Sequence, residues 1–472
     1  MARTRPVAGV DSSTQSCKYI IVDSRSGELL HSSALPHPDG TAIDPARWWE
    51  ALHGVGAATG NDVRGLSVAA QQQTTIFLDE RGASVHDAIL WNDSRAASQG
   101  LALRAEWGES RWLRTFGLLP GAAHPVSKLK WLREHSPEAA DQVAQVLMPH
   151  DWLTWRLLGG THSGYEPTTD RSEASGTGYW SVVERSYRED IMRLAFGRTF
   201  RAPRVLQPEE AAGTMPNGTV LAAGCGDNAA THLGLDSQVG EAVVSIGTSL
   251  TVSTLSRSPL YDRRGHIENM ADATGRYLPI IVSLNGARTL SSVARMLRID
   301  LNELDLLAAA GAPDADGITF TPYLDGERTP LLPNAKGALL GLTRTALTAE
   351  NIARAAVLGV ACAVADAIET FEEAEAFVHT ITAVGGGSRS IALRQAIADL
   401  TGRPVAWPEP AEYAARGAAR QAAWAVDGEL PIWARPSRSE TTPLQSASWA
   451  TDLRHRYRVA AERALSTSPL GT

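Results

Sequence analysis

The amino-acid sequence predicts an α/β fold divided into two domains. Short β-branched runs alternate with stretches of helical periodicity, the pattern of strands and helices packed in layers. At 472 residues the chain exceeds the length that one hydrophobic core usually organises. A strand, a turn rich in Ser and Thr, and a second strand occur near the N-terminus and again from residue 241. We therefore expect two lobes of similar plan, 1–236 and 237–472, although two unrelated hairpins would give the same pattern.

The first half opens with a predicted hairpin. Its strands are Val7–Val10 and Tyr19–Val22, and the turn after them leads into a third strand, Glu28–Ser32. Asp44 is the expected N-cap of the next helix, with Pro45 at its first position. The remaining expected elements of this half are the buried strand Gly65–Ala69 and the helices Val126–Glu134 and Pro149–Leu158.

The second half repeats the strand, turn and strand in Glu241–Ile246 and Leu250–Thr254. Thr348 is the expected N-cap of a long Ala-rich helix, and Gly402 is expected to end a later one. The elements expected after residue 340 are the helices Thr348–Thr370, Ser390–Thr401 and Glu409–Val426 and the strand Thr380–Val384. The tail from Leu465 is expected to fray.

Composition excludes several classes of function. A net charge of −8 disfavours a nucleic-acid surface, which needs clustered Lys and Arg. Three cysteines without a CxxC pair indicate reduced thiols and a cytoplasmic protein. The apolar run after the basic segment Met1–Pro6 is too short for a signal peptide, and no run reaches the roughly 20 residues that cross a membrane. Clustered Gly and Ser/Thr turns remain compatible with a small phosphate-bearing ligand.

Two aspartates stand where phosphoryl-transfer chemistry would need carboxylates. Asp11 ends the first strand and precedes a hydroxyl-rich turn, so it could face a hydrated Mg²⁺ ion while Thr14, Gln15 and Ser16 donate to phosphates. An ordinary β-turn is the alternative. Asp227 follows two glycines at an expected helix start, where a carboxylate could accept the proton of a sugar hydroxyl. Helix capping alone is the alternative there.

Two further motifs carry weaker signals. Trp91, Asn92 and Asp93 combine an aromatic ring with an amide and a carboxylate, a mixture suited to binding polyol hydroxyls. Trp91 would equally serve as a core residue. Between a strand and a helix, three glycines at 385–387 and Ser388 would let a flat base lie against bare backbone. The chain contains no GxxxxGK[ST] phosphate loop, no HExxH and no GxSxG motif.

The order of these motifs resembles the FGGY carbohydrate kinases over residues 7 to 430. The order is Asp-x-x-Thr, Trp-Asn-Asp-x-Arg, Gly-Asp-Asn-Ala-Ala, Gly-Thr-Ser and Gly-Gly-Gly-Ser. Residues 124–135 and 337–356 are similar to the two signatures of the family, with departures at Ala123 and Leu358. Residues 319–330 are similar to a stretch of the members that phosphorylate xylulose.

The resemblance implies two actin-like, ribonuclease H-like α/β domains with an interdomain cleft for sugar and ATP. It implies that Asp227 is the catalytic base and that Asp11 serves the phosphates and, through water, Mg²⁺. It assigns ATP contacts to two hairpin turns and one glycine-rich loop: Ser13, Thr14, Gln15, Gly247, Thr248, Ser249, Gly385, Gly386, Gly387 and Ser388. Ser13 stands where many members have Gly, so the first turn is expected to be less open.

The expected substrate is a ketopentose, D-xylulose, because the Trp-Asn-Asp and Gly-Asp-Asn motifs are most similar to xylulose-phosphorylating members. The expected sugar contacts are Gln72, Gln73, Trp91, Asn92, Asp93 and Asn228. Gln73 stands where those members have a histidine, and Thr74 where they have a glycine. Glutamine donates and accepts hydrogen bonds without titrating, so a kinase for ribulose or another polyol is an alternative.

Two alternatives outside the sugar kinases also fit the sequence. A sensor that binds sugar or nucleotide without catalysis would share the fold, although Asp11 and Asp227 are both present. An actin-like or chaperone-like ATPase is disfavoured by the Trp-Asn-Asp motif. The expected partners are the sugar and ATP, with no nucleic acid and no membrane, and the sequence leaves a homodimer open.

Overall fold

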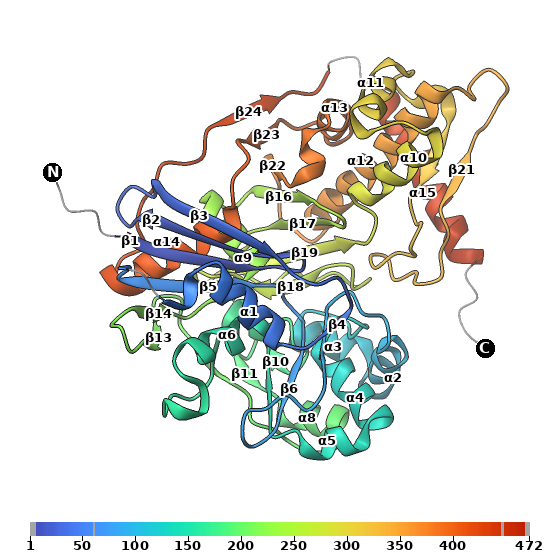
Figure 1. Ribbon diagram of the computed structural model, residues 1–472. Coiled ribbons are helices and arrows are strands. Elements are labelled where there is room, and N and C mark those ends of the chain that lie inside the picture. Colours follow the sequence, from blue (N-terminus) through green and yellow to red (C-terminus); the bar gives the residue numbers. More distant parts are fainter. Residues whose placement is uncertain (1–5, 60–61, 445–447, 468–472) are drawn as a thin grey trace. The chain divides into compact units, whose positions relative to one another are not determined.

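The computed structural model describes residues 6–59, 62–444 and 448–467 (Figure 1). These residues form two compact units. Unit 1 comprises Met1–Ser237, Arg257–Leu278 and Ala411–Arg435, and unit 2 comprises Gln238–Ser256, Pro279–Pro410 and Pro436–Thr472. The first long segment of unit 1 ends close to residue 236, where the sequence predicts the boundary, but two segments from the second half of the chain also belong to unit 1.

A mixed sheet forms the centre of unit 1. Its strands are hydrogen-bonded in the order β13-β14-β5-β1-β2-β3, and β15 also pairs with β5. These strands are β1 Pro6–Ser12, β2 Ser16–Asp23, β3 Leu29–Pro36, β5 Gly65–Ala70, β13 Ala211–Thr214, β14 Val220–Ala222 and β15 Cys225–Gly226. The predicted hairpin, third strand and buried strand of the first half are therefore confirmed.

Unit 2 contains a second sheet with the order β19-β17-β16-β22-β23-β24. Its strands are β16 Glu241–Ile246, β17 Leu250–Thr254, β19 Tyr277–Ser283, β22 Thr380–Val384, β23 Val405–Pro408 and β24 Arg438–Thr441. Strand β19 enters unit 2 at Pro279. All three strands predicted for the second half occur.

The two sheets share one plan. In unit 1, β1 pairs antiparallel with β2 and parallel with β5, and β2 pairs antiparallel with β3. In unit 2, β16 pairs antiparallel with β17 and parallel with β22, and β17 pairs antiparallel with β19. Each hairpin therefore has one antiparallel and one parallel neighbouring strand at equivalent positions. This confirms two lobes of similar plan over the alternative of unrelated hairpins.

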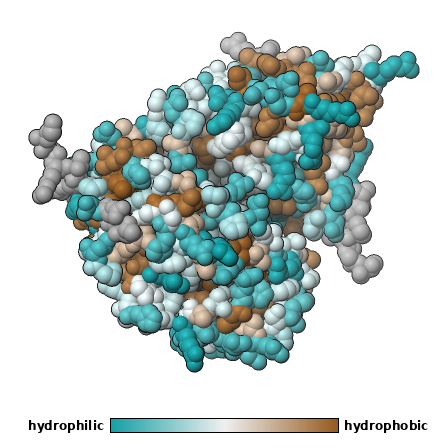
Figure 2. All heavy atoms as spheres, in the orientation of Figure 1, coloured by the Kyte–Doolittle hydropathy of each residue, from teal (hydrophilic) through white to brown (hydrophobic). Residues whose placement is uncertain are grey.

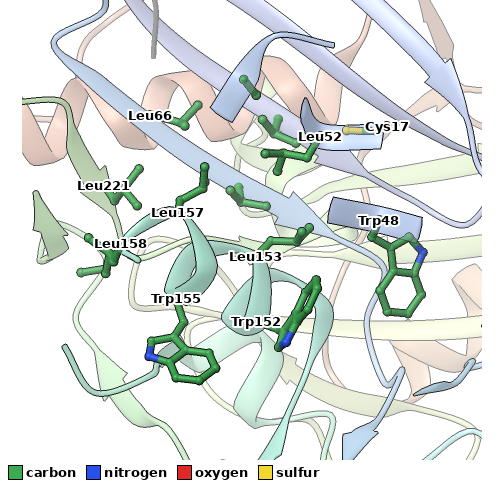
Figure 3. Packing of buried hydrophobic residues seen from close by; sticks show 14 of the residues in the cluster. Cys17, Trp48, Leu52, Leu66, Trp152, Leu153, Trp155, Leu157, Leu158 and Leu221 are labelled. Carbon is green, nitrogen blue, oxygen red and sulfur yellow. The ribbon is translucent and has the colours of Figure 1, made fainter. Parts of the chain in front are cut away.

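Helices cover both faces of the unit 1 sheet. The helices of this unit are α1 Ala46–Gly54, α2 Ala97–Trp107, α3 Glu109–Phe116, α4 Pro125–His135, α5 Pro137–Gln142, α6 Pro149–Leu157, α7 Arg171–Ala174, α8 Glu189–Phe196, α9 Asp227–Leu235 and α14 Tyr413–Asp427. Figure 3 shows one side of the core, where Trp48 and Leu52 of α1 and Leu153 of α6 pack in a cluster with Cys17 and Leu66 of the sheet. Burying such apolar side chains is the dominant favourable contribution to folding.

Helix α14 covers the other face and meets α9 through glycines. Its alanines pack against Val7 of β1 in a separate buried cluster. A Cβ atom on Gly417 of α14 would lie 1.8 Å from the carbonyl oxygen of Ala230 in α9, and one on Gly234 would lie 2.1 Å from the carbonyl oxygen of Tyr413. Only glycine allows backbones so close. In Figure 1, α14 therefore lies beside strands from the opposite end of the sequence.

The remaining elements are short strands and the helices of unit 2. The helices of unit 2 are α10 Ala287–Leu297, α11 Leu301–Ala310, α12 Ala349–Glu373, α13 Ile391–Thr401 and α15 Trp449–Thr467. The two-stranded pairs are formed by β4 Ala42–Ile43, β6 Ile76–Leu78, β7 Ala88–Ile89, β8 Gln145–Leu147, β9 Thr168–Asp170, β10 Trp180–Ser181, β11 Ser186–Tyr187, β12 Arg204–Leu206, β20 Thr319–Thr321 and β21 Ala338–Leu340. Strand β18 is Glu268–Ala271.

Local capping explains several helix boundaries. Thr348 accepts the N–H of Asn351 at the start of α12, and Gly402 ends α13 in the left-handed region with φ 65°, both as predicted. Helix α1 begins one position later than expected, at Ala46, because Pro45 is the N-cap. Asp44 still accepts the N–H of Ala46 at 2.9 Å, so the capping contact is retained.

Helix α15 corrects the prediction for the C-terminal tail. Residues 465–467, which the sequence assigns to a frayed tail, form the last turn of this helix. Residues 468–472 of that predicted tail lie outside the described part of the chain, as does most of the basic segment Met1–Pro6.

Helix α12 is, by length and composition alone, apolar enough to cross a membrane. However, 89% of its most apolar window is buried within the protein. Core helices of soluble proteins satisfy the same length and composition. We therefore interpret α12 as the central core helix of unit 2.

Exposed apolar side chains gather on one part of unit 2. Figure 2 shows hydrophobic residues over the region where Figure 1 places α10, α11 and α13. Met296, Leu301, Leu306 and Ile391 are each more than half exposed there. Within the described residues, unit 2 itself leaves these side chains uncovered.

Candidate active site

Three parallel strand ends bring the two candidate aspartates of unit 1 to one edge of its sheet. Ser12 of β1 and Gly226 of β15 are both register partners of Ala70 in β5. Asp11 is therefore the penultimate residue of β1, and Asp227 follows directly after β15 as the first residue of α9. The carboxyl ends of adjacent parallel strands form the usual binding edge of an α/β sheet.

Asp11 is buried, with 3% of its surface exposed, and is paired with a cation. Its register partner in the hairpin, Lys18, places Nζ 3.6 Å from Asp11 Oδ2 and 2.7 Å from Oε2 of Glu412. The Ser13 hydroxyl also donates to Asp11 Oδ1. Burial raises the pKa of the Asp11 carboxyl, and Lys18 and Ser13 partly offset that rise. Lys18 thus connects the first hairpin with the start of α14.

Asp227 has the pKa of a group that exchanges protons near neutrality. Its pKa is raised from 3.8 to about 7, mainly by burial and next by the negative charge of Asp11. Its Oδ1 accepts the backbone N–H of Asn228 at 2.8 Å, which counteracts part of the rise. No side-chain capping bond of α9 involves this carboxylate. The alternative that Asp227 serves as the N-cap is therefore wrong, because Gly226 occupies that position.

A hydrogen-bond chain joins Asp227 to the predicted sugar wall. Asn228 Nδ2 donates to Asp227 Oδ1 at 2.9 Å and to Gln72 Oε1 at 3.1 Å. Gln72 Nε2 in turn donates to the carbonyl oxygen of Ser172 at 3.0 Å. The hydroxyl of Ser172 accepts the Gly226 N–H at 2.9 Å. A Cβ atom on Gly226 would lie 2.3 Å from the Gln72 side chain, so only glycine fits there. The structure thus brings Gln72, Asn228 and Asp227 together.

Gln73 lies next to them in an unusual backbone conformation. Its φ is 62°, which is uncommon for a residue with a side chain. Its N–H donates to Glu173 Oε1 at 3.0 Å, and its carbonyl oxygen accepts from the fully buried Lys128 Nζ at 2.7 Å. Gln73 Nε2 donates to Glu268 Oε2 at 3.0 Å, and His124 Nε2 lies 3.5 Å from the same oxygen. Charged groups therefore fix both the backbone and the amide of Gln73.

Trp91, Asn92 and Asp93 have different environments. The Trp91 indole donates to the Thr14 hydroxyl at 2.8 Å, so it contacts the turn of the first hairpin. Asn92 is exposed. Both oxygens of Asp93 accept hydrogen bonds from the Arg95 guanidinium at 2.8 Å. Burial opposes but does not cancel the effect of Arg95, which lowers the pKa of Asp93.

In unit 2, the predicted second phosphate turn and the glycine-rich loop lie against each other. The turn Gly247–Ser249 joins β16 and β17, and the loop Gly385–Ser388 follows β22, the parallel neighbour of β16. A Cβ atom on Gly385 would lie 2.7 Å from the carbonyl oxygen of Ile246, and one on Gly387 would lie 2.4 Å from the Ile246 side chain. Thr248 and Gly386 are exposed, so both segments reach the solvent, and the loop does so with a residue that has no side chain.

The comparisons with known proteins identify the family. Residues 7–240 match the N-terminal domain of the FGGY family of carbohydrate kinases, and residues 242–426 match its C-terminal domain. The chain belongs to the FGGY family of carbohydrate kinases. Its fold is accordingly the two-domain, actin-like α/β fold that the resemblance implies.

Relatives of this FGGY kinase match it along nearly its whole length. It is 39% identical over 440 residues to a protein named xylulose kinase from Streptomyces coelicolor, covering 90% of this chain and 88% of that protein. A xylulose kinase from Streptomyces rubiginosus is 38% identical over 443 residues, with coverages of 90% and 89%. The crystal structure of xylulose kinase from Bifidobacterium adolescentis superimposes with a TM-score of 0.87 at 35% identity, covering 97% and 99% of the two chains.

A buried charge cluster that sequence reasoning missed supports the predicted sugar wall. His150 Nε2 lies 3.3 Å from Asp151 Oδ1, 3.3 Å from Asp170 Oδ1 and 3.9 Å from Glu173 Oε2. All four side chains are almost completely buried. Burial lowers the pKa of His150, but the three carboxylates outweigh it and raise that pKa to about 9. Glu173 accepts the N–H of Gln73, and Asp170 accepts the Ser172 N–H at 2.8 Å. The cluster therefore holds Gln73 directly and Gln72 through Ser172.

The kinase offers one carboxylate, rather than a full ligand cage, for a metal ion. Among the described residues, no group of three or more His, Cys, Asp and Glu side chains is arranged to hold a metal. Mg²⁺ usually keeps several waters and binds through one or two carboxylates together with substrate phosphates. A single buried carboxylate at the base of a hydroxyl-rich turn, as at Asp11, fits that mode of binding.

Proposed function

We propose that this FGGY kinase transfers the γ-phosphoryl group of ATP to the terminal hydroxyl of a ketopentose, D-xylulose. The proposal is supported by relatives named xylulose kinase at 38% and 39% identity over 90% of the chain. The observation that carries the chemistry is Asp227, a carboxylate at a helix start with a pKa of about 7, hydrogen-bonded to Asn228.

Asp227 is the proposed general base. The sugar oxygen forms a bond to the γ-phosphorus, the bond from that phosphorus to the bridging oxygen breaks, and ADP leaves. Asp227 accepts the hydroxyl proton late, because the transition state is loose and needs little deprotonation of the nucleophile. A pKa near 7 suits this role, because a large fraction of the carboxylate is ionised near neutral pH and is still basic enough to take the proton.

The proposed sugar wall consists of Gln72, Gln73 and Asn228, with Trp91, Asn92 and Asp93 at its border. Gln72 and Asn228 are suited to orient hydroxyls because hydrogen bonds fix both side chains. Asn228 donates to Gln72 and to Asp227, and Gln72 donates to the carbonyl oxygen of Ser172. Asp93 would act through an oxygen that Arg95 already holds in place. Fixed amides and carboxylates discriminate between hydroxyl configurations more sharply than mobile ones.

The proposed ATP contacts are the two hairpin turns and the glycine-rich loop. Ser13, Thr14 and Gln15 belong to the first turn, Gly247–Ser249 to the second, and Gly385–Ser388 to the loop. Backbone N–H groups of such turns form anion-binding concavities. Asp11 would hold Mg²⁺ through water, and the bound ion would neutralise negative charge on the phosphates.

The test of the base is Asp227→Asn, with Asp190→Asn as the matched control. Asp190 is exposed on α8 and pairs with Arg188, so its substitution removes the same charge outside the site. Sugar-dependent ADP release is expected to fall by about 100-fold or more in Asp227→Asn and to stay unchanged in the control. Turnover within a few-fold of the parent, with an unchanged circular dichroism spectrum, would remove Asp227 from the role of base.

Gln73 favours a second candidate, a kinase for ribulose or another polyol. Glu268 fixes the amide of Gln73. The amide would therefore bind a different arrangement of sugar hydroxyls from the histidine that is expected at this position in xylulose-phosphorylating relatives. Coupled ADP assays with D-xylulose, D-ribulose, L-ribulose, glycerol and gluconate separate the candidates by kcat/KM. The highest value for D-xylulose supports the first proposal, and a higher value for another sugar replaces it.

A further inference from the structure

Glu327 is buried in unit 2, where hydrogen-bond donors of one loop surround its carboxylate. Only 2% of its surface is exposed. Its Oε1 accepts the N–H of Leu284 at 3.0 Å and of Arg328 at 2.7 Å. Its Oε2 accepts the Ser283 hydroxyl at 2.6 Å and Asn285 Nδ2 at 3.1 Å. Three of these four donors belong to consecutive residues, so the carboxylate fixes the conformation of that loop.

The loop held by Glu327 packs directly against the second phosphate turn. It connects β19, which ends at Ser283, with α10, which begins at Ala287. A Cβ atom on Gly286 would lie 2.4 Å from the carbonyl oxygen of Ser249 and 2.7 Å from that of Gly247. The Ala287 N–H donates to the Gly247 carbonyl oxygen at 2.8 Å. The turn therefore rests directly on backbone whose conformation Glu327 determines.

We propose that Glu327 is a positioning residue for ATP, which holds the 283–287 loop so that the Gly247–Ser249 turn keeps its backbone N–H groups aligned for the phosphates. The inference deepens the proposed function and rests on it. The hydrogen bonds of Glu327 go to the loop and to Arg328, and its effect reaches the turn through Gly286 and Ala287. It lies in the stretch 319–330 that the sequence singles out without assigning it a role.

The neighbouring Asn285 makes a carboxylate necessary at position 327. Asn285 Oδ1 accepts the Leu324 N–H at 3.1 Å, and its Nδ2 donates to the Gly326 carbonyl oxygen at 2.8 Å. These two bonds fix the orientation of the Asn285 amide, so its Nδ2 donates to Glu327 and its Oδ1 cannot take that place. A glutamine at 327 would leave either that donor or a backbone donor facing an NH₂ group. Glu327→Gln is therefore nearly isosteric and still disturbs the loop.

The experiment compares Glu327→Gln with Asp325→Asn and Ser283→Ala. Asp325 is two residues away, exposed, and bound to Arg288, so Asp325→Asn removes the same charge without touching the loop 283–285. ATP and ADP affinity are measured by titration calorimetry, and KM for ATP and for the sugar by coupled assay. Glu327→Gln is expected to weaken nucleotide binding about tenfold, with sugar KM within twofold of the parent. Asp325→Asn is expected to match the parent, and Ser283→Ala, which removes one donor of the four, to weaken nucleotide binding about threefold.

Two outcomes overturn the inference. One is a lower melting temperature of Glu327→Gln with parental nucleotide affinity, which would make the residue merely structural. The other is an equal rise in KM for both substrates. Should Glu327→Gln fail to fold, Ser283→Ala decides, and parental ATP affinity in that variant refutes the positioning role. A parent enzyme that binds ATP but phosphorylates no sugar contradicts the proposed function alone, because the calorimetric comparison still tests Glu327.

Discussion

The indole N–H of Trp91 donates to the hydroxyl of Thr14 at 2.8 Å. A residue that the sequence assigns to the sugar is therefore bonded to a residue that it assigns to the phosphates. Both belong to unit 1, and Thr14 lies in the turn that follows Asp11. The bond gives the proposed sugar wall a direct means of fixing the turn of the first hairpin.

Removing this bond is expected to impair the use of ATP. Trp91→Phe keeps an aromatic ring but loses the donor, and Thr14→Val loses the acceptor. A net hydrogen bond contributes about 1 kcal/mol, so each variant is expected to lower kcat/KM for ATP about fivefold. The double variant should be little worse than either single one, because the bond is lost only once. Effects that multiply in the double variant would show that the two side chains act independently.

Asp227 is expected to give the rate a pH dependence. Since the base must be ionised, kcat/KM for the sugar should rise tenfold per pH unit below about 7 and level off above it. A profile measured from pH 5 to 9 with saturating ATP tests this. A plateau that extends down to pH 5 would place the pKa of the base near its ordinary value and contradict the burial effect.

The same shift predicts how stability changes with pH. Between 3.8 and about 7, native Asp227 binds more protons than the unfolded chain does, so its contribution to the unfolding free energy falls as the pH rises. In Asp227→Asn, residue 227 does not titrate, so this fall of the unfolding free energy with rising pH is absent. Its melting temperature relative to the parent should therefore increase from pH 4.5 to pH 7.5, whereas the exposed control Asp190→Asn should show no such trend. A difference that stays constant over this range contradicts the raised pKa.

The buried His150 cluster is expected to stabilise unit 1 in a pH-dependent way. The pKa of His150 is raised to about 9, so its stabilising charge is fully present below 6.5 and is lost as the pH rises through 9. His150→Gln leaves Asp151, Asp170 and Glu173 without their cation and should lower the unfolding free energy by about 3 kcal/mol near pH 7. Melting temperatures at pH 7 and 10 should show a smaller deficit at pH 10. An equal deficit at both values, or one as large in the exposed control His135→Gln, would refute a charged His150.

Local sequence signals predict the elements that carry the site. The strand, Ser/Thr turn and strand around Asp11 and the strand, glycines and helix around Asp227 each depend on residues close together in sequence. The close backbone approach just before Asp227 requires a glycine, and such a requirement can be predicted from residue type alone. The N-cap at Thr348 and the helix end at Gly402 are predictable for the same reason.

Contacts between distant segments were not predictable from one sequence. Lys18 gives no local sign that it bridges Asp11 and Glu412, because the bridge depends on how α14 packs against the first hairpin. His150 likewise looks like any polar residue at the start of a helix, and only the fold surrounds it with three carboxylates. The segment Arg257–Leu278 joins unit 1 for equally long-range reasons and carries Glu268 to Gln73.

The glycine-rich loop provides a matched pair of substitutions that separates nucleotide contact from folding. A Cβ atom on Gly387 would lie 2.4 Å from the Ile246 side chain, whereas one on Gly386 would meet nothing within 4 Å. Gly387→Ala should therefore lower both the melting temperature and the affinity for ATP. Gly386→Ala should leave the melting temperature unchanged and still weaken ATP binding, because its methyl group would occupy the exposed face on which the adenosine is proposed to lie. Parental ATP affinity in Gly386→Ala, measured by calorimetry, would mean that the nucleotide does not contact this face of the loop.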